Sequence, residues 1–206
     1  MSTTKKTGRP RKFDKNEALA AAVNVFWAKG YDGASMKDLT EAMGINGPSL
    51  YSTFGDKREL YLQAIDSYAA NGGCAPLVAF ETEPNIELAV RAFMDAVIEY
   101  ATHHDSGAKG CFLASSVSTS CGEVMGVQEL LSNAVEDTDQ RLANRFEAEK
   151  EKGTLPANFP SLERARLMFD LRQGHVFRAR AGLSEDQMHD DLDYRARMIL
   201  AKPGSI

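Results

Sequence analysis

The chain has 206 residues, of which 43% are apolar and 26% charged, and its formal net charge is −5. This composition fits one compact or two small domains and excludes a chain that is disordered throughout. The longest uncharged runs, Ser67 to Phe80 and Gly110 to Gly122, are too short to span a membrane, and no apolar N-terminal segment resembles a signal peptide. We therefore expect a cytoplasmic protein, and three cysteines are too few for a disulfide framework.

The charge is distributed unevenly. Residues 1–60 contain ten Lys and Arg against seven Asp and Glu, a net charge of +3, so the remaining 146 residues carry −8. A basic end on an acidic body directs a protein toward a polyanion. We expect residues 1–12 to form a flexible basic arm in which Arg9, Arg11 and Lys12 contact DNA, because an extended Gly-Arg-Pro segment suits a narrow minor groove. The alternative is a solvated tail that adds only non-specific attraction.

The first helix is predicted from Asp14, as part of a reciprocal cap with Glu17, to Gly30. Its apolar residues recur at helical spacing, which indicates one buried face. They are Leu19, Ala22, Val23, Phe26 and Trp27. We interpret this stripe as core.

A second, short helix is predicted to follow. Ser35 and Asp38 form an S-x-x-D cap at its start, and Gly44 stands where a left-handed residue ends a helix. Leu39, Ala42 and Met43 then share one face at helical spacing, which we expect to be buried.

The third helix begins after a tight turn. Asn46 is a good cap, and Pro48 fits the first turn, where its missing N–H does no harm. Leu50 and Phe54 lie four residues apart and are expected to point inward. The outer side is then small and polar, so it can approach another surface closely. It consists of Gly47, Ser49, Ser52 and Thr53. This is a helix-turn-helix pattern, whose second helix reads base edges in the DNA major groove.

The motifs Gly44-Ile45-Asn46, Pro48-Ser49-Leu50-Tyr51 and Phe54-Gly55-Asp56-Lys57 resemble the TetR family of bacterial transcriptional regulators. The resemblance covers about Phe13 to Tyr68 and includes Lys29-Gly30-Tyr31 at the end of the first helix. It implies an all-α homodimer of about nine helices, with an N-terminal helix-turn-helix three-helix domain and a larger C-terminal helical domain for effector binding and dimerisation. It places the domain limits at residues 1–12 (arm), 13–70 (DNA binding) and 71–206 (ligand binding and dimerisation).

The same resemblance implies that Tyr51 and Lys57 hold phosphates, while the exposed side of Asn46 to Thr53 meets bases. Gly47 departs from the family, whose members often carry Arg or Lys there. The predicted DNA-binding residues are Arg9, Arg11, Lys12, Ser35, Asn46, Gly47, Ser49, Tyr51, Ser52, Thr53 and Lys57.

Further helices are predicted along the rest of the chain. Asp56 and Glu59 cap a fourth helix, whose apolar side is Leu60, Tyr61, Ala64, Ile65 and Tyr68. Residues 71–84 are interpreted as a junction, 85–100 or 85–104 as a buried central helix, 105–110 as a turn and 111–117 as a short apolar segment. A long helix is expected from Val124 to Gly153, and two last helices over 161–181 and 184–201. We expect these last two to pair with a second copy.

The chain lacks the motifs of nucleotide hydrolysis, serine hydrolysis and zinc proteolysis, and we predict a repressor with no catalytic residue, metal or cofactor. His103 and His104, with Cys111 and Cys121, lack ligand spacing, so we interpret them as solvated histidines and buried thiols. The two alternatives are a small enzyme or thiol sensor that uses Cys111, and an architectural DNA-binding protein without a ligand. Residues expected to line an effector pocket, with Arg172 able to bind an acidic effector, are Phe93, Val97, Cys111, Phe112, Ser115, Met168, Arg172 and His175.

Overall fold

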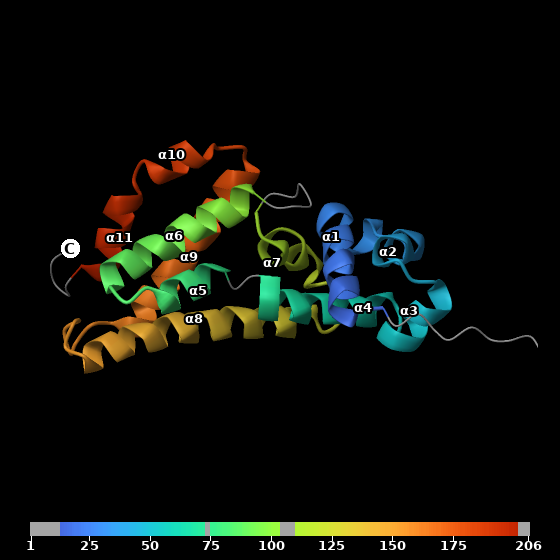
Figure 1. Ribbon diagram of the computed structural model, residues 1–206, viewed down its shortest axis with the longest axis horizontal. Helices are drawn as coiled ribbons and strands as arrows, with labels where there is room; N and C mark the ends of the chain where they lie inside the picture. Colours follow the sequence, from blue (N-terminus) through green and yellow to red (C-terminus); the bar gives the residue numbers. More distant parts are fainter. Residues whose placement is uncertain (1–12, 73–74, 104–109, 202–206) are drawn as a thin grey trace, which may run out of the picture.

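The computed structural model describes residues 13–72, 75–103 and 110–201, and within them every regular element is a helix (Figure 1). Nine α-helices in this part of the chain have eight residues or more, as predicted. The first four form what we call the head: α1 (Lys15–Gly33), α2 (Met36–Met43), α3 (Gly47–Phe54) and α4 (Lys57–Ser67), with α4 continued by a π-helical turn at Tyr68–Gly72.

The remaining elements form what we call the body, which lies on the opposite side of the molecule from α3 in Figure 1. Its elements are α5 (Ala75–Thr82), α6 (Ile86–Thr102), α7 (Phe112–Ser115), a 3-10 turn η2 (Val117–Ser120), α8 (Val127–Glu151), α9 (Ser161–Arg180), α10 (Glu185–His189) and α11 (Leu192–Leu200). None of the described helices is long and apolar enough to cross a membrane.

Local side-chain caps explain where the head helices begin. Ser35 and Asp38 form the predicted reciprocal cap of α2, and Asp56 and Glu59 form that of α4. Asp14 caps α1 by accepting from the backbone of Asn16 and Glu17, at 2.7 and 3.2 Å. The predicted reciprocal cap with Glu17 was therefore wrong, because both hydrogen bonds use the Asp14 carboxylate as acceptor and the cap is one-sided.

Glycines end the helices where the chain must turn left-handed. Gly44 closes α2 at φ 65°, as predicted. Gly55 separates α3 from α4 at φ 81°, and a Cβ atom there would lie 1.8 Å from a carboxylate oxygen of Glu59. A side chain at position 55 would therefore displace the residue that caps α4.

A cluster of aromatic rings joins the head to the body. Phe112 of α7 lies 5.3 Å from Tyr68, 6.1 Å from Trp27 and 6.3 Å from Tyr61, measured between ring centroids. All four rings are buried. Aromatic contacts of this kind add stability beyond the area that they bury, so the head is packed firmly against α7.

The helix α6 packs into the core of the body with one face only, so the prediction of a helix buried all round was wrong: Leu88 on its other face is 57% exposed. Phe80 of α5 packs on Phe93 of α6 and Phe146 of α8, and Phe146 packs in turn on Phe159. Each of these four side chains is at most 2% exposed. The apolar side of α4 is buried as predicted, from Leu60 to Tyr68.

Further sequence predictions about the fold were wrong. The segment interpreted as a junction contains the helix α5, whose Pro76 and Leu77 are buried. The predicted last helix is broken into α10 and α11 around Asp190 and Asp191. Ala42 is exposed, because Leu39 and Met43 alone face the core. The predicted end of the first helix at Gly30 is confirmed, since Gly30 is non-helical at φ 72° and separates the main part of α1 from a last short turn to Gly33. The predicted turn at residues 105–110 lies almost wholly outside the described residues.

Candidate nucleic-acid interface and ligand cavity

The helix α3 projects at the far end of the head (Figure 1). Leu50 and Phe54 point inward and are 0% and 2% exposed. The side chains between them therefore face outward on a helix that is only eight residues long. The sequence predicted this division, and it leaves a polar outer surface of the size that enters a major groove.

Two of the predicted DNA-binding residues also hold the local fold. The Asn46 side chain accepts a hydrogen bond from the Ser49 backbone N–H at 2.9 Å, which caps α3. Ser35 donates from its hydroxyl to Asp38 at 2.7 Å and accepts from the Asp38 backbone N–H at 3.1 Å. The Asn46 amide nitrogen remains as a donor that the cap does not use.

The other residues on the outer side of α3 are small. Ser52 and Thr53 are exposed, and the Ser52 hydroxyl donates to the Ser49 carbonyl at 3.1 Å. A Cβ atom built at Gly47 would meet no atom within 4 Å. Packing therefore does not require glycine at position 47. The glycine leaves the first turn of α3 without a side chain at this position.

The residues predicted to bind phosphate lie beside α3. Tyr51 is 55% exposed. Lys57 is the first residue of α4, and its amine lies 4.6 Å from the Tyr31 ring centroid and 3.4 Å from the Asp32 carbonyl oxygen. Within the described residues no carboxylate lies in ion-pair range of Lys57. This amine therefore keeps its charge available to an anion.

The described part of the head is not basic. Residues 13–60 contain five of the ten Lys and Arg of residues 1–60 and all seven acids, which gives a net charge of −2. Lys29 pairs with Asp38 at 2.6 Å, and this contact, with the Ser35 hydrogen bonds, holds the pKa of Asp38 well below its usual range. The positive charge of the N-terminal region therefore belongs to residues 1–12. The predicted DNA-binding residues Arg9, Arg11 and Lys12 are among them and lie outside the described residues.

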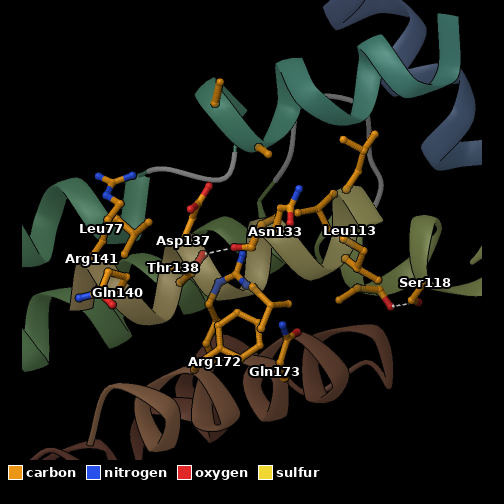
Figure 2. Close-up of a pocket in the computed structure, with 18 of the residues that line it drawn as sticks. Leu77, Leu113, Ser118, Asn133, Asp137, Thr138, Gln140, Arg141, Arg172 and Gln173 are labelled. Carbon is orange, nitrogen blue, oxygen red and sulfur yellow. Dashed lines mark hydrogen bonds between the residues drawn. The ribbon is translucent and has the colours of Figure 1, made fainter. Parts of the chain in front are cut away.

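A cavity of about 850 Å³ lies between the end of α4, α8 and α9 (Figure 2). Its lining includes apolar side chains from every side, among them Leu77, Leu113 and Phe169. Figure 2 shows Asn133, Asp137 and Thr138 on α8 facing Arg172 and Gln173 on α9. This volume and this mixture of apolar and polar groups are those of a small-molecule site.

Only Arg172, of the eight residues predicted for an effector pocket, lines this cavity. Ser115 is half-buried and accepts a hydrogen bond from the Trp27 indole at 3.1 Å. The other six side chains are buried and are absent from the cavity lining: Phe93, Val97, Cys111, Phe112, Met168 and His175. The sequence analysis drew the pocket from residues of α6, α7 and α9, whereas the described cavity is lined mainly by α8, with residues of α4, α5, α7 and α9.

The lining residues of α8 were missed although their pattern carried a signal. Leu130, Leu131, Ala134 and Val135 lie within the long helix that the sequence predicted, and all four are only half-buried. Polar residues alternate with them along the same helix, at Asn133, Asp137 and Thr138. A mixed face of this kind indicates a cavity wall better than a uniformly apolar face does.

The candidate metal or thiol site is not assembled in the part of the chain that the structure describes. No group of three or more His, Cys, Asp and Glu there could hold a metal ion. Cys111 is buried, Cys121 is half-buried and both are free thiols. His103 is solvent-exposed, as predicted, and His104 lies outside the described residues.

Comparisons with known proteins agree with this geometry. The family described as "Bacterial regulatory proteins, tetR family" matches residues 18–64. The HTH-type transcriptional repressor ComR of Escherichia coli (strain K12) is 27% identical over 185 residues, which cover 89% of this chain and 88% of ComR. The repressor BdcR of the same organism is 28% identical, over 82% of this chain and 84% of BdcR. The solved structure of CifR, a TetR family transcriptional regulator complexed with a 26 bp operator DNA, is 28% identical with a TM-score of 0.81, over 92% of this chain and 98% of that chain.

An all-helical body that carries an exposed, capped helix-turn-helix defines a DNA-binding transcriptional regulator. The relatives agree, since each is a regulator of transcription and none is an enzyme. The chain belongs to the TetR family of bacterial transcriptional regulators.

Proposed function

We propose that this chain is a homodimeric repressor that leaves a near-palindromic operator when a small effector fills the cavity along α8. The observation that carries the proposal is α3, a helix held at both ends by caps and turned so that its small polar side faces solvent. The proposed domains are the arm at 1–12, the DNA-binding domain at 13–70 and the ligand-binding and dimerisation domain at 71–206. The proposed compartment is the cytoplasm.

The proposed DNA contacts fall into two classes. Ser49, Ser52, Thr53 and the Asn46 amide meet base edges, with Gly47 allowing close approach, while Tyr51, Lys57 and the start of α2 at Ser35 meet phosphates. Arg9, Arg11 and Lys12 add contacts in the minor groove. Since the described head has a net charge of −2, the arm supplies most of the attraction to DNA.

Coupling between cavity and head is proposed to run through the segment Phe112–Ser120. Leu113, Ala114 and Ser118 of this segment line the cavity. On its other side the segment is bonded to the head by three hydrogen bonds. These are Trp27 to Ser115 at 3.1 Å, Ser116 to the Phe26 carbonyl at 3.0 Å, and the Tyr61 and Ser120 hydroxyls at 3.0 Å. A ligand that shifts one side of the segment must therefore move the anchors of α1 and α4.

The helix α4 gives a second connection. Asp66 near its end and Ala69 in the π turn line the cavity, while Lys57 starts the same helix beside α3. A hundredfold preference of the effector for one head spacing amounts to about 2.7 kcal/mol, which one pocket can supply.

The last two predicted helices, now α9 to α11, are the proposed dimer face. Most of the apolar residues predicted to pair with a second copy, such as Met168, Met188 and Leu192, are buried within the chain. Large apolar side chains remain exposed on α9 and α11, namely Leu162, Leu167, Phe177 and Tyr194. Their burial against the same surface of a second copy would remove them from water.

The deciding experiment is a footprint with the full-length protein on the DNA upstream of its own coding region. Two protected half-sites about one helical turn apart are expected, at a stoichiometry of two chains per operator. Protection of one half-site by a single chain would exclude the dimeric repressor. Uniform coating without a preferred site would favour the architectural alternative.

Lys57→Ala is expected to weaken binding to every DNA sequence by about tenfold and to reduce the slope of log affinity against log salt by about one for each head. The reason is that the Lys57 amine has no carboxylate partner and lies beside α3. Tyr51→Phe, which removes one hydroxyl, should weaken binding by a few-fold. Filter binding over a series of salt concentrations measures both. Lys150→Ala, the same change on α8 of the body, is the control and should leave both quantities unaltered.

Ser49→Ala and Ser52→Ala are expected to change sequence preference instead, with a loss of about 1 kcal/mol on the preferred operator and none on non-specific DNA. Ser52 is exposed and Ser49 is half-buried, whereas Leu50 and Phe54 form the buried side of α3. Affinities for a set of operators with single base changes provide the measurement. An equal loss on every operator variant would contradict a base-reading role.

A further inference from the structure

Two arginines of the described residues line the cavity, Arg141 and Arg172. Arg141 has a carboxylate partner, because it donates to Glu81 at 2.8 and 2.7 Å. Arg172 is 9% exposed, and no described carboxylate lies within 4 Å of its guanidinium. A guanidinium taken out of water is costly unless an anion meets it.

The neighbours of Arg172 do not supply that anion. Its guanidinium donates to the Cys111 sulfur at 3.5 Å and lies 5.6 Å from the Phe169 ring centroid, and both are weak partners. The hydroxyls of Tyr68 and Tyr100 are hydrogen-bonded to each other close by. Burial raises the pKa of Tyr100 to about 12 and raises that of Tyr68 as well, so both remain neutral phenols at neutral pH.

The other charges of the lining lie in a different setting. Asp66 and Asp137 are both solvent-exposed, although partial burial raises the pKa of the Asp66 carboxyl. Figure 2 shows Asp137 on α8 and Arg172 rising from α9 toward that helix. The amides of Asn133 and Gln173 lie on the same two helices and can donate to an acceptor beside the guanidinium.

We infer that the cavity takes an apolar carboxylate, whose carboxyl group binds the Arg172 guanidinium while its hydrocarbon body lies against Leu77, Leu113 and Phe169. A guanidinium matches the two oxygens of a carboxylate, and the pair forms two parallel charge-assisted hydrogen bonds. Asp66 and Asp137 disfavour a second negative charge on the ligand. The inference rests on the proposed function in one respect, namely that this ligand is the effector.

The test measures ligand binding without DNA. Straight-chain and aromatic carboxylates of graded length are titrated into the full-length protein by calorimetry, together with the amides and amines of the same carbon skeletons. At least one carboxylate is expected to bind about tenfold or more tightly than its amide, with the amine weaker still. If no carboxylate exceeds its amide, or if an amine binds best, the assignment of an anionic ligand is overturned.

Variants connect the preference to Arg172. Arg172→Gln should abolish the difference between carboxylate and amide, and Arg172→Lys should retain part of it, since it keeps the charge but loses the planar fork. Arg178→Gln, an exposed arginine on the same helix, is the matched control and should behave as the wild type. Cys111→Ala should leave the carboxylate preference in place. Loss of the preference in Cys111→Ala but not in Arg172→Gln would overturn the assignment.

A gel shift with operator DNA keeps this inference separate from the proposed function. A carboxylate that binds in the Arg172-dependent manner but does not release the operator would contradict effector release and leave the ligand class intact. Release of the operator by a neutral or cationic ligand, with no carboxylate binding, would support effector release and overturn the ligand class. Circular dichroism and melting temperature of Arg172→Gln without ligand would show whether a loss of binding follows from unfolding.

Discussion

Phe112→Ala is expected to lower the free energy of unfolding by about 3–5 kcal/mol, because it leaves a cavity among rings that are almost wholly buried. The lost contacts are those with Tyr68, Trp27 and Tyr61, which belong to the head, whereas Phe112 itself belongs to the body. The substitution should therefore loosen the junction between them as well as the fold. Urea unfolding gives the stability, and hydrogen exchange gives the place of the loosening.

A matched variant separates these two effects. Phe146→Ala removes an equally buried ring from the cluster of Phe80 and Phe159, which lies entirely in the body. Its stability cost should be similar, but backbone amides of α1 and α4 should gain exchange mainly in Phe112→Ala, and those of α5 and α8 mainly in Phe146→Ala. The same exchange pattern in both variants would mean that the aromatic junction does not act as a unit of its own.

The head could be predicted from sequence because short-range chemistry fixes its elements. Ser35 with Asp38, Asp56 with Glu59, and Asn46 before Pro48 are caps formed within three residues, and each was found as expected. Gly44 and Gly55 follow from the backbone angles that their turns require. These signals are independent of the rest of the protein, so a single sequence is enough to read them.

The body was harder to predict because its boundaries depend on contacts between distant segments. The helix α5 follows two glycines and contains Pro76 near its start, and this composition is typical of a junction between domains. Leu77 and Phe80 are nevertheless buried, because α5 packs against α6 and α8. The break between α10 and α11 contains no proline or glycine, so the sequence carries no local signal from which the break could be predicted. The cavity depends on the spacing of three helices, which no local pattern records.

The helix α9 carries two polar residues that the sequence analysis assigned to the same pocket. Arg172 and His175 lie three residues apart on it, and both are buried polar groups in a protein of this size. Arg172 faces the cavity, which gives its charge a use. His175 is not among the cavity lining residues, and its neighbours by charge are Arg195, Asp191, Arg178 and His189. These two residues of one helix therefore differ: Arg172 can meet a ligand in the cavity, whereas His175 is enclosed by protein.

His175 is 1% exposed, and neither ring nitrogen has a hydrogen-bond partner within the described residues. Burial, with smaller contributions from Arg195, Arg178 and His189, lowers its pKa to about 4, against the opposing effect of Asp191. In the unfolded chain the histidine pKa is near its ordinary value of 6.5. Between pH 6.5 and about pH 4 the unfolded chain therefore binds a proton at His175 that the folded chain does not bind. Folding stability must therefore fall as the pH is lowered through this window.

His175→Leu is expected to remove this pH dependence. Between about pH 7 and pH 4.5 the wild type should lose about 2 kcal/mol more of its free energy of unfolding than the variant does. At neutral pH the variant should be at least as stable as the wild type, because leucine has a similar volume and replaces two ring nitrogens that have no partner. Urea unfolding at both pH values provides the measurement, and His103→Gln, at an exposed site, is the control. Equal loss in wild type and His175→Leu would mean that His175 takes up its proton without unfolding, through an opening of α10 and α11 away from α9.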